Sequence, residues 1–267
     1  EPKVRDAIEY AASNIKKFHE EQMPESMWFT HVDDGLMVGE KTTPIVDVCL
    51  YVPRGKGSFP SVLLMLGIPA IVAGVKKIIV VTPPNEQGEI DDAILAAAKI
   101  IGITQIFKVG GIQAVAAAAY GTQTIPKCHK IIGPGNSYAT AAKRVLSSYI
   151  DTGLPAGPSE AIILADEHAD AHKVALDWMI EAEHGPDSAS LLVTHSQELV
   201  YKVLPIVEQQ LSKLSQKRAD FIRANFSTYG GVIITSSLDE SIDFVNEYAP
   251  EHMEVMCENP FDILPRI

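Results

Sequence analysis

Residues 105–120 read QIFKVGGIQAVAAAAY, and this stretch decides the expected fold. An apolar segment of strand length, 105–109, runs through Gly110 and Gly111 into an alanine-rich helix at 112–120. Other apolar runs of strand length recur along the chain with helical patterns between them. Such alternation is typical of βαβ units and of a parallel sheet that is buried on both faces. The pattern therefore predicts an α/β protein.

Working outward from this stretch, we expect about eight strands, at 46–52, 78–82, 105–109, 130–132, 161–165, 190–194, 232–235 and 253–256. The expected helices lie at 4–21, 90–101, 112–120, 137–150, 171–182, 197–214 and 238–248. Eight strands are more than one compact doubly wound unit usually needs, so two Rossmann-like sheets are expected. A ligand is expected at the loops that follow the carboxyl ends of the strands.

The bulk properties limit the class of partner. With 267 residues and 46% hydrophobic content, the chain can bury one large core or two modest ones. Its net charge of -12 argues against nucleic acid and anionic membrane surfaces, which need a basic face, and favours a small-molecule ligand. The apolar stretch 62–75 is interrupted and too short to cross a bilayer.

The cysteines and the chain ends carry two further expectations. Cys49, Cys128 and Cys257 are widely spaced and form no CxxC pair, so neither a disulfide framework nor a thiolate metal site is expected, and a cytoplasmic protein fits this use of cysteine. No signal peptide is visible at the start, and both ends look cut, since 261–267 is an apolar segment without a cap or polar tail.

Two glycine-containing turns, 109–113 and 132–136, lead from expected strands into expected helices. Exposed backbone N–H groups at the start of a helix attract a pyrophosphate. Neither turn contains GxGxxG, and the strand at 78–82 ends in Pro83 rather than in the acidic residue that usually binds a ribose. Judged alone, each turn is as consistent with a simple tight turn as with cofactor binding.

Three segments carry candidate substrate, metal and acid–base groups. Ser159 lies in a constrained loop suited to positioning a substrate, although spacing alone favours an ordinary turn serine and no GxSxG surrounds it. Glu181 and His184 are three residues apart on one helix face, which suits zinc, while a histidine at a helix C-terminus is the simpler interpretation. Glu251 and His252 precede a strand and suit two successive proton transfers, while spacing alone favours a solvated pair.

These segments occur together and in this order, and the combination resembles the histidinol dehydrogenase family. The matching stretches extend over nearly the whole chain, and the last three are specific: YVP at 51–53, VGGIQA at 109–114, GPGN at 133–136, AGPSE at 156–160, AEHGPDS at 182–188 and YAPEH at 248–252.

The resemblance implies two Rossmann-like domains, one inserted in the other, with an NAD-binding domain at 51–158 and a catalytic domain formed by 1–50 and 159–267. It implies NAD contacts at Tyr51, Gln113 and Asn136 without the usual glycine fingerprint. It implies a zinc-assisted oxidation of L-histidinol, an amino alcohol, through the aldehyde to L-histidine, the last steps of histidine biosynthesis. A cytoplasmic homodimer is expected.

The resemblance also implies roles for the other candidates. Ser159 and His184 match substrate and zinc contacts, while His252 matches the base that takes the alcohol proton and Glu251 the group that activates water. Glu181 stands where the family usually has a glutamine zinc ligand; it is expected to contact the substrate and the metal. Zinc is expected to orient the substrate rather than to supply the nucleophile.

The family extends well beyond residue 267 and supplies an aspartate and a histidine zinc ligand from that later part. Residues 1–267 are therefore expected to hold half of the metal site and to be inactive when isolated. Two alternatives stay open. One is a paralogue that oxidises another hydroxymethyl compound, such as an anionic diol, since Arg54 and Lys56 make one turn cationic. The other is an inactive NAD-binding fragment.

Overall fold

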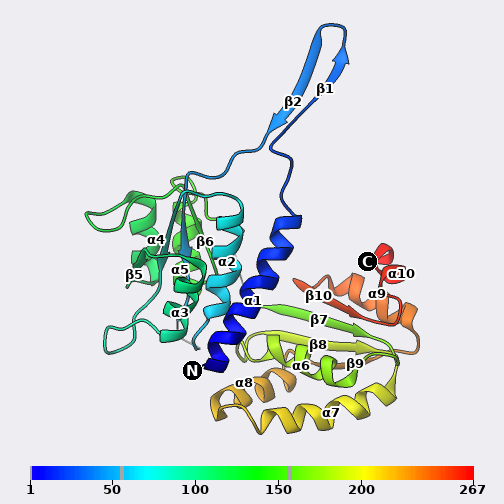
Figure 1. The fold of residues 1–267 in the computed structure, drawn as a ribbon. Coiled ribbons are helices and arrows are strands. Elements are labelled where there is room, and N and C mark those ends of the chain that lie inside the picture. Colours follow the sequence, from blue (N-terminus) through cyan, green and yellow to red (C-terminus); the bar gives the residue numbers. More distant parts are fainter. Residues whose placement is uncertain (1, 55–56, 155–157) are drawn as a thin grey trace. The chain divides into compact units, whose positions relative to one another are not determined.

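The computed structural model of the chain describes residues 2–54, 57–154 and 158–267, and it divides into two compact units, Glu1–Ala156 and Gly157–Ile267. Each unit is built on a four-stranded parallel sheet with helices on both faces (Figure 1). The expectation of an α/β protein with two parallel sheets is confirmed. No helix in the described ranges is both long enough and apolar enough to cross a membrane.

The sheet of the first unit has the order β5-β4-β3-β6. Its strands are β3 (Asp47–Tyr51), β4 (Lys77–Val81), β5 (Ile106–Phe107) and β6 (Lys130–Ile132), all parallel. Strands β4 and β5 extend the sheet on one side of β3, and β6 pairs with β3 on the other side. This is the order in which a doubly wound Rossmann sheet begins, and it opens a crevice outside the carboxyl ends of β3 and β6.

Helices cover both faces of this sheet. One core packs α1 (Pro2–Glu21), α2 (Pro60–Val72) and α3 (Asp92–Ile101) against Leu50 and Val80. The other packs α4 (Gly111–Tyr120) and α5 (Ser137–Leu146) against alternate residues of the same strands, including Cys49 and Tyr51. Because successive strand side chains point to opposite faces, Tyr51 belongs to the α4–α5 side.

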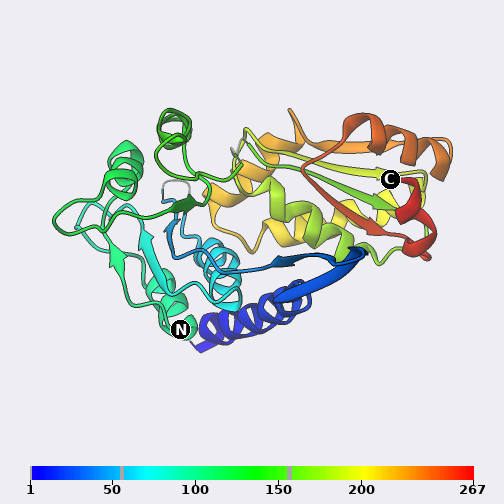
Figure 2. The same ribbon diagram turned by 90° about the horizontal axis from the view of Figure 1, so that it is seen from above.

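The second unit repeats this topology. Its strands β7 (Glu160–Ala165), β8 (Ala189–Thr194), β9 (Gly231–Ile234) and β10 (His252–Met256) have the order β10-β7-β8-β9, again with the fourth strand beside the first. One face carries α6 (Ala171–Ala182), α7 (Gln197–Leu211) and α8 (Gln216–Phe226), and the other carries α9 (Leu238–Tyr248) and the short α10 (Pro260–Ile263), which runs into a 3-10 turn (Leu264–Arg266) (Figure 2).

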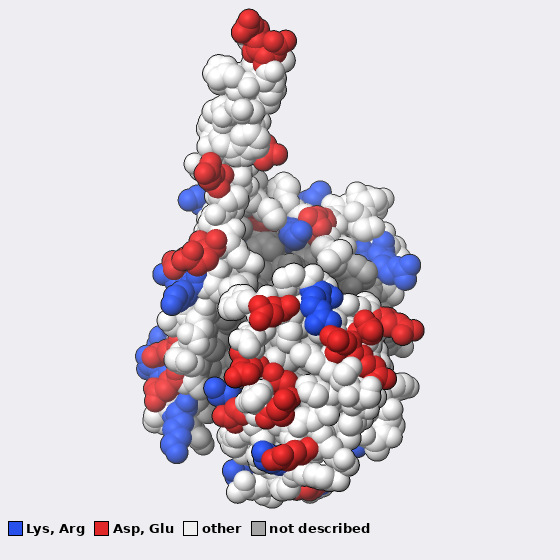
Figure 3. Space-filling model, turned by 90° about the vertical axis from the view of Figure 1, so that its right-hand side faces the viewer, with Lys and Arg blue, Asp and Glu red and all other residues white. Residues whose placement is uncertain are grey.

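A two-stranded antiparallel hairpin, β1 (Met27–Asp33) and β2 (Leu36–Lys41), extends from the first unit between α1 and β3. Every residue of both strands is exposed. In Figure 3 the hairpin is an arm that is uncharged along much of its length and acidic at its tip, where Asp33 and Asp34 lie beside Gly35. Two strands alone are marginally stable in water, so this arm is a surface that lacks a covering layer within the described residues.

The expected elements all occur in the structure and in the expected order, but not every bound agrees and further elements are present. All eight strands and all seven helices are present, with shifts of a few residues, and α5 and α7 end before the expected 150 and 214. The hairpin, α2, α8 and α10 were not predicted. The stretch 62–75 was treated as an interrupted apolar run, yet α2 forms there with Pro60 in its first turn and tolerates Pro69 inside, because Leu63, Leu64 and Ile68 are buried in the core.

The expected domain grouping joined residues 1–50 to residues 159–267. In the structure, α1 and β3 share the compact unit of the cofactor residues, and Ile8 of α1 joins the core with Leu50. The inserted-domain arrangement remains a prediction about the longer protein. Lys56 and the segment 155–157 lie outside the described residues.

Candidate active site

The expected acid–base pair lies at the amino edge of the second sheet. Strand β10 pairs with β7 so that His252 is opposite Ala161. The loop before β10 is redirected where α9 ends, since Ala249 adopts the left-handed conformation (φ 51°) and Pro250 follows. The loops that carry Glu251 and Ser159 therefore meet at one edge. The sequence analysis expected a ligand at the carboxyl ends of the strands, whereas the expected acid–base residues of this unit lie at the amino ends.

The backbone of Glu160 contacts both members of the acid–base pair. The Glu160 amide donates to Glu251 Oε2 at 3.4 Å, and His252 Nδ1 lies 3.3 Å from the Glu160 carbonyl oxygen and 3.7 Å from Glu251 Oε2. A carbonyl can only accept, so Nδ1 carries the proton in this contact and Nε2 is the basic nitrogen. Both side chains remain about half exposed and can reach a substrate from this edge.

The expected metal donors lie at the end of α6 and in the loop that leads into β8. His184 Nδ1 donates to the carbonyl of Ile180 at 2.9 Å, and Glu181 Oε1 lies 3.7 Å from the same ring. A zinc-binding histidine usually donates one ring nitrogen to a carbonyl or carboxylate in this way. The loop reaches the same sheet edge, since the Ala189 amide that follows it donates to Ser159 O at 2.9 Å.

These donors fit part of a zinc site. An imidazole nitrogen and a carboxylate are suitable zinc ligands, and the side chain of Glu181 is only 14% exposed, so it is held in place. A protein zinc site normally has three or four protein ligands. Within residues 2–54, 57–154 and 158–267, no group of three His, Cys, Asp or Glu side chains is arranged to hold a metal ion.

Two carboxylates near these donors were missed in the sequence analysis. Asp177 precedes Glu181 by four residues on one face of α6, and His184 follows Glu181 by three, just after the helix ends. Glu254 shares a face of β10 with His252. Burial raises the pKa of Glu254, and the carboxylates of Asp177 and Glu181 raise it further. The signal was present as two-residue alternation in 252–256. This face of the unit concentrates negative charge and suits a cationic group.

The expected cofactor residues lie at the crevice of the first unit. Tyr51 ends β3, is 2% exposed, and accepts a hydrogen bond of 2.8 Å from the Gly111 amide at the start of α4. Asn136 follows β6 and caps α5 by accepting from the Ala139 amide at 3.0 Å. Gln113 is exposed in the first turn of α4. Tyr51 therefore positions a helix start, while Gln113 and Asn136 present amide groups to solvent.

The crevice fits a phosphate-bearing ligand on two observations. Helix α4 begins at Gly111 after Gly110, which has no side chain to cap it. The Gly111 amide donates to Tyr51, and the amides that follow it in the first turn have no side-chain cap, while a Cβ at Gly110 would collide with Pro83. At the carboxyl end of β4, the buried hydroxyl of Thr82 has no hydrogen-bond partner among the described residues. A buried hydroxyl without a partner is costly unless a ligand or water satisfies it.

A cluster of acidic and histidine side chains lies at the carboxyl edge of the sheet in the second unit. Glu167 contacts His195 at 2.8 Å and His168 at 3.8 Å, and His168 is 3.5 Å from Glu258. Asp166 holds this group together, since its carboxylate accepts from the amides of His168 and Glu258. The side chains of this cluster pair with one another, and none of them is an expected site residue. The cluster is therefore not the candidate site.

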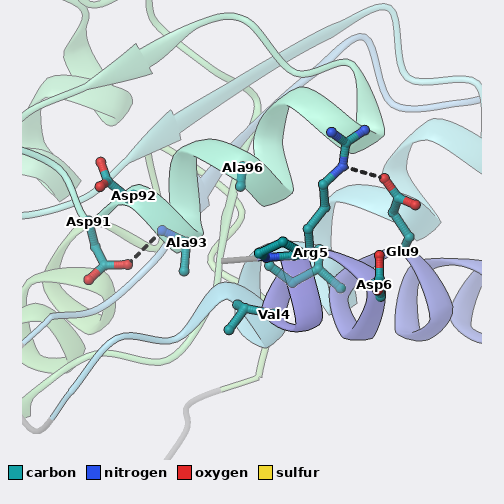
Figure 4. Close-up of a pocket in the computed structure, with 10 residues that line it drawn as sticks. Val4, Arg5, Asp6, Glu9, Asp91, Asp92, Ala93 and Ala96 are labelled. Carbon is teal, nitrogen blue, oxygen red and sulfur yellow. Dashed lines mark hydrogen bonds and ion pairs between the residues drawn. The ribbon is translucent and has the colours of Figure 1, made fainter.

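A groove of about 870 Å³ lies between the first turns of α1 and the start of α3 (Figure 4). Three of its charged side chains have local partners. Arg5 pairs with Glu9 at 2.8 Å, and Asp91 caps α3 by accepting from the Ala93 amide. None of the expected site residues lines this groove, so its size does not make it the candidate site.

Comparisons with known proteins identify the family of the chain. The family model described as histidinol dehydrogenase matches residues 1–267. Histidinol dehydrogenase of Synechocystis sp. is 50% identical over the whole chain, and the chain covers 62% of that relative. A histidinol dehydrogenase homolog of Cereibacter sphaeroides is 51% identical, with 61% of its length covered.

Solved structures agree as well. The crystal structure of histidinol dehydrogenase from Elizabethkingia anophelis matches with a TM-score of 0.89 and 40% identity, over 100% of this chain and 61% of that one. The chain thus spans about three-fifths of the length of the relatives it matches. Family model, relatives and fold agree, and this chain belongs to the histidinol dehydrogenase family.

Proposed function

We propose that the protein to which this chain belongs oxidises L-histidinol through the aldehyde to L-histidine with NAD, in the last steps of histidine biosynthesis. The observation that carries this proposal is the attachment of both Glu251 and His252 to Glu160 at one sheet edge. Family membership and relatives named histidinol dehydrogenase support the substrate class, a small amino alcohol.

In the first step, His252 Nε2 takes the hydroxyl proton of the alcohol, since Nδ1 is occupied as a donor to Glu160 O. The carbon–oxygen bond becomes a carbonyl as the carbinol carbon gives up its hydride. NAD supplies the hydride acceptor when it is bound. One alcohol and one NAD⁺ thus give one aldehyde, one NADH and one proton.

In the second step, Glu251 removes a proton from a water molecule that adds to the aldehyde carbon, and the resulting hydrate has a hydrogen to lose from the same carbon. His252 again takes a hydroxyl proton as the second hydride leaves. One aldehyde, one water and one NAD⁺ give one acid and one NADH with the release of protons. Glu251 and His252, adjacent in the sequence, thus take the protons that are released as one carbon is oxidised twice.

The other candidates bind rather than react. Gln113 and Asn136 are proposed to contact the dinucleotide, and Tyr51 to hold the start of α4 against it through Gly111. Ser159 is proposed to contact the substrate. Glu181 and His184 are proposed to hold zinc and orient the substrate, with the remaining ligands supplied outside residues 1–267.

The experiment that tests the proposal uses the longest natural version of the chain and follows NADH absorbance with histidinol and with a panel of other alcohols. Selective oxidation of histidinol supports it, and activity only with another hydroxymethyl compound contradicts it. The paralogue alternative is not favoured, and of the two cations that motivated it only Arg54 is described, as an exposed residue. The inactive-fragment alternative predicts no activity with any alcohol from the longest chain.

A cytoplasmic homodimer is also proposed. All three cysteines are free thiols, which suits a reducing compartment. The hairpin exposes large apolar side chains that a partner subunit would remove from water: Met27, Trp28, Phe29, Val32, Leu36, Met37 and Val38. Light scattering of the longest natural chain tests the dimer, and a monomer at micromolar concentration contradicts it.

A further inference from the structure

Lys143 is a buried cation at the cofactor crevice that no proposed role yet uses. It lies on the inner face of α5 and is only 9% exposed, whereas its neighbour Arg144 on the same helix is exposed. Lysine is almost never this buried unless it is paired, because removing an ammonium group from water is costly. Its burial therefore requires an explanation.

The contacts of Lys143 join the two strand ends that form the crevice. Its Nζ donates a hydrogen bond to the carbonyl of Gly133, directly after β6. The same nitrogen lies 5.8 Å from the centre of the ring of Tyr51, the last residue of β3. The ring of Tyr51 in turn holds the start of α4 through Gly111. Lys143 thus contacts both sides of the point where the order of the sheet reverses.

These contacts do not neutralise the charge. An ammonium group has three N–H donors, and the described residues offer it one acceptor, the Gly133 carbonyl. No carboxylate of the described part of the chain forms an ion pair with Lys143. Burial disfavours the charged ammonium group and so lowers the pKa of Lys143. A buried cation with a neutral acceptor and an aromatic ring lacks an anionic partner that a ligand can supply.

We propose that Lys143 is a positioning residue for the cofactor loop, residues 133–136, and that its positive charge is neutralised by the phosphates of a bound dinucleotide. This inference rests on the proposed use of NAD. The crevice beside β3 and β6 is where a dinucleotide binds in a doubly wound sheet, and its pyrophosphate is the anionic part. The side chain of Lys143 is nearly inaccessible to solvent, so it does not bind the phosphates directly. It acts on them by holding the loop at Gly133 and by the electrostatic attraction of its charge.

The test measures NAD⁺ affinity by calorimetry for the longest natural chain and three variants. Lys143→Met removes the charge and keeps the length of the side chain, Lys143→Arg keeps the charge, and Arg144→Met removes a charge from the exposed neighbouring position. We expect Lys143→Met to weaken NAD⁺ binding by about tenfold or more, Lys143→Arg to restore part of it, and Arg144→Met to change it less than twofold. Unfolding midpoints, measured alongside, establish that each variant is folded.

The outcomes separate this inference from the cofactor proposal. If the wild-type chain does not bind NAD⁺, the cofactor proposal fails and the inference with it. If the wild-type chain binds and Lys143→Met binds equally well, or no worse than Arg144→Met, the inference alone is overturned. In the longest natural chain, Lys143→Met should raise KM for NAD⁺ and leave kcat within about twofold. A fall in kcat at unchanged KM would also overturn it.

Discussion

The backbone amide of Glu160 donates a hydrogen bond of 3.4 Å to the carboxylate of Glu251, and the carbonyl of the same residue lies 3.3 Å from His252 Nδ1. The first residue of β7 therefore orients both members of the acid–base pair, Glu251 just before β10 and His252 at its first position. Neither side chain needs to be buried for this, because two backbone groups of a paired strand set the geometry.

Glu251→Gln is expected to block the second oxidation and spare the first. A glutamine cannot take a proton from water, so aldehyde oxidation should fall by about 10²- to 10⁴-fold, the usual contribution of a general base. Single-turnover NADH formation in the longest natural chain, started with histidinol and separately with the aldehyde, measures each step. Glu247→Gln, on the exposed side of α9, is the control. An unchanged rate with the aldehyde would remove Glu251 from the mechanism.

His184→Ala is expected to weaken zinc binding in every version of the protein that contains α6. The 267-residue chain offers two of the expected ligands, so its zinc affinity should be at least about tenfold below that of the longest natural chain, and it should be inactive. Zinc titrations of both chains, with His31→Ala on the exposed hairpin as control, measure this. Tight zinc binding that His184→Ala leaves unchanged, or full activity of the short chain, contradicts the proposed site.

Asp47→Asn is expected to lower the free energy of unfolding by about 2 kcal/mol at neutral pH, since hydrogen bonds to a charged group contribute about 1.5–3 kcal/mol. The buried carboxylate of Asp47 accepts from the amide of His129 at 2.6 Å and lies 2.9 Å from its ring. Burial acts to raise the pKa of Asp47, but the bonds from His129 outweigh it and the net pKa lies below the ordinary 3.8.

Because the pKa of Asp47 is lowered in the folded chain, its stabilising contribution is complete above 3.8 and is lost as the pH falls through the folded value. Urea unfolding of wild type and Asp47→Asn should therefore differ near pH 7 and converge in strong acid. Asp243→Asn, at an exposed position of α9, should show no such difference. A gap between the two proteins that persists at the lowest pH would rule out this origin.

Gly133→Ala is expected to destabilise the cofactor loop by several kcal/mol. Gly133 adopts φ +128°, and a Cβ there would collide with the backbone carbonyl of Tyr51. Gly35→Ala is the matched control, since its φ is also positive (+73°) but nothing lies within 4 Å of the added carbon. Thermal unfolding should show a much larger loss for Gly133→Ala. Equal losses would mean that backbone conformation alone, and not the approach of β3, requires glycine at 133.

Much of the fold was predictable because hydrophobic alternation and glycine stops are local signals. Strand β4 is apolar after Lys77 and β8 is buried along its whole length, as burial on both faces of a parallel sheet requires. Helix α3 ends before Gly102, which adopts the left-handed conformation. Helix α2 was missed because Gly67 and Pro69 interrupt its pattern, while tertiary packing overrides their low helix propensity. The hairpin was missed because neither of its faces is buried, so its strands carry no inward and outward alternation.

The candidate site was predictable only in part, because the contacts and burial of each side chain depend on segments that are distant in the sequence. The motifs around His184 and His252 identified those residues, but sequence could not show that Glu160 would orient the pair. Lys143 was not singled out, since a lysine in a helix is usually solvated and its burial depends on how α5 packs on the sheet. Glu254 was likewise hidden, because its neighbours Asp177 and Glu181 come from a distant segment.

The central claim is that one acid–base pair, Glu251 and His252, serves both oxidations of histidinol, and the stoichiometry of NADH tests it most directly. Histidinol is supplied in limiting amount to the longest natural chain with excess NAD⁺, and NADH is measured at completion. The account predicts two NADH per histidinol for wild type and strongly impaired formation for His252→Gln. A yield of one NADH per histidinol in wild type, or none with histidinol while another alcohol is oxidised, would contradict it.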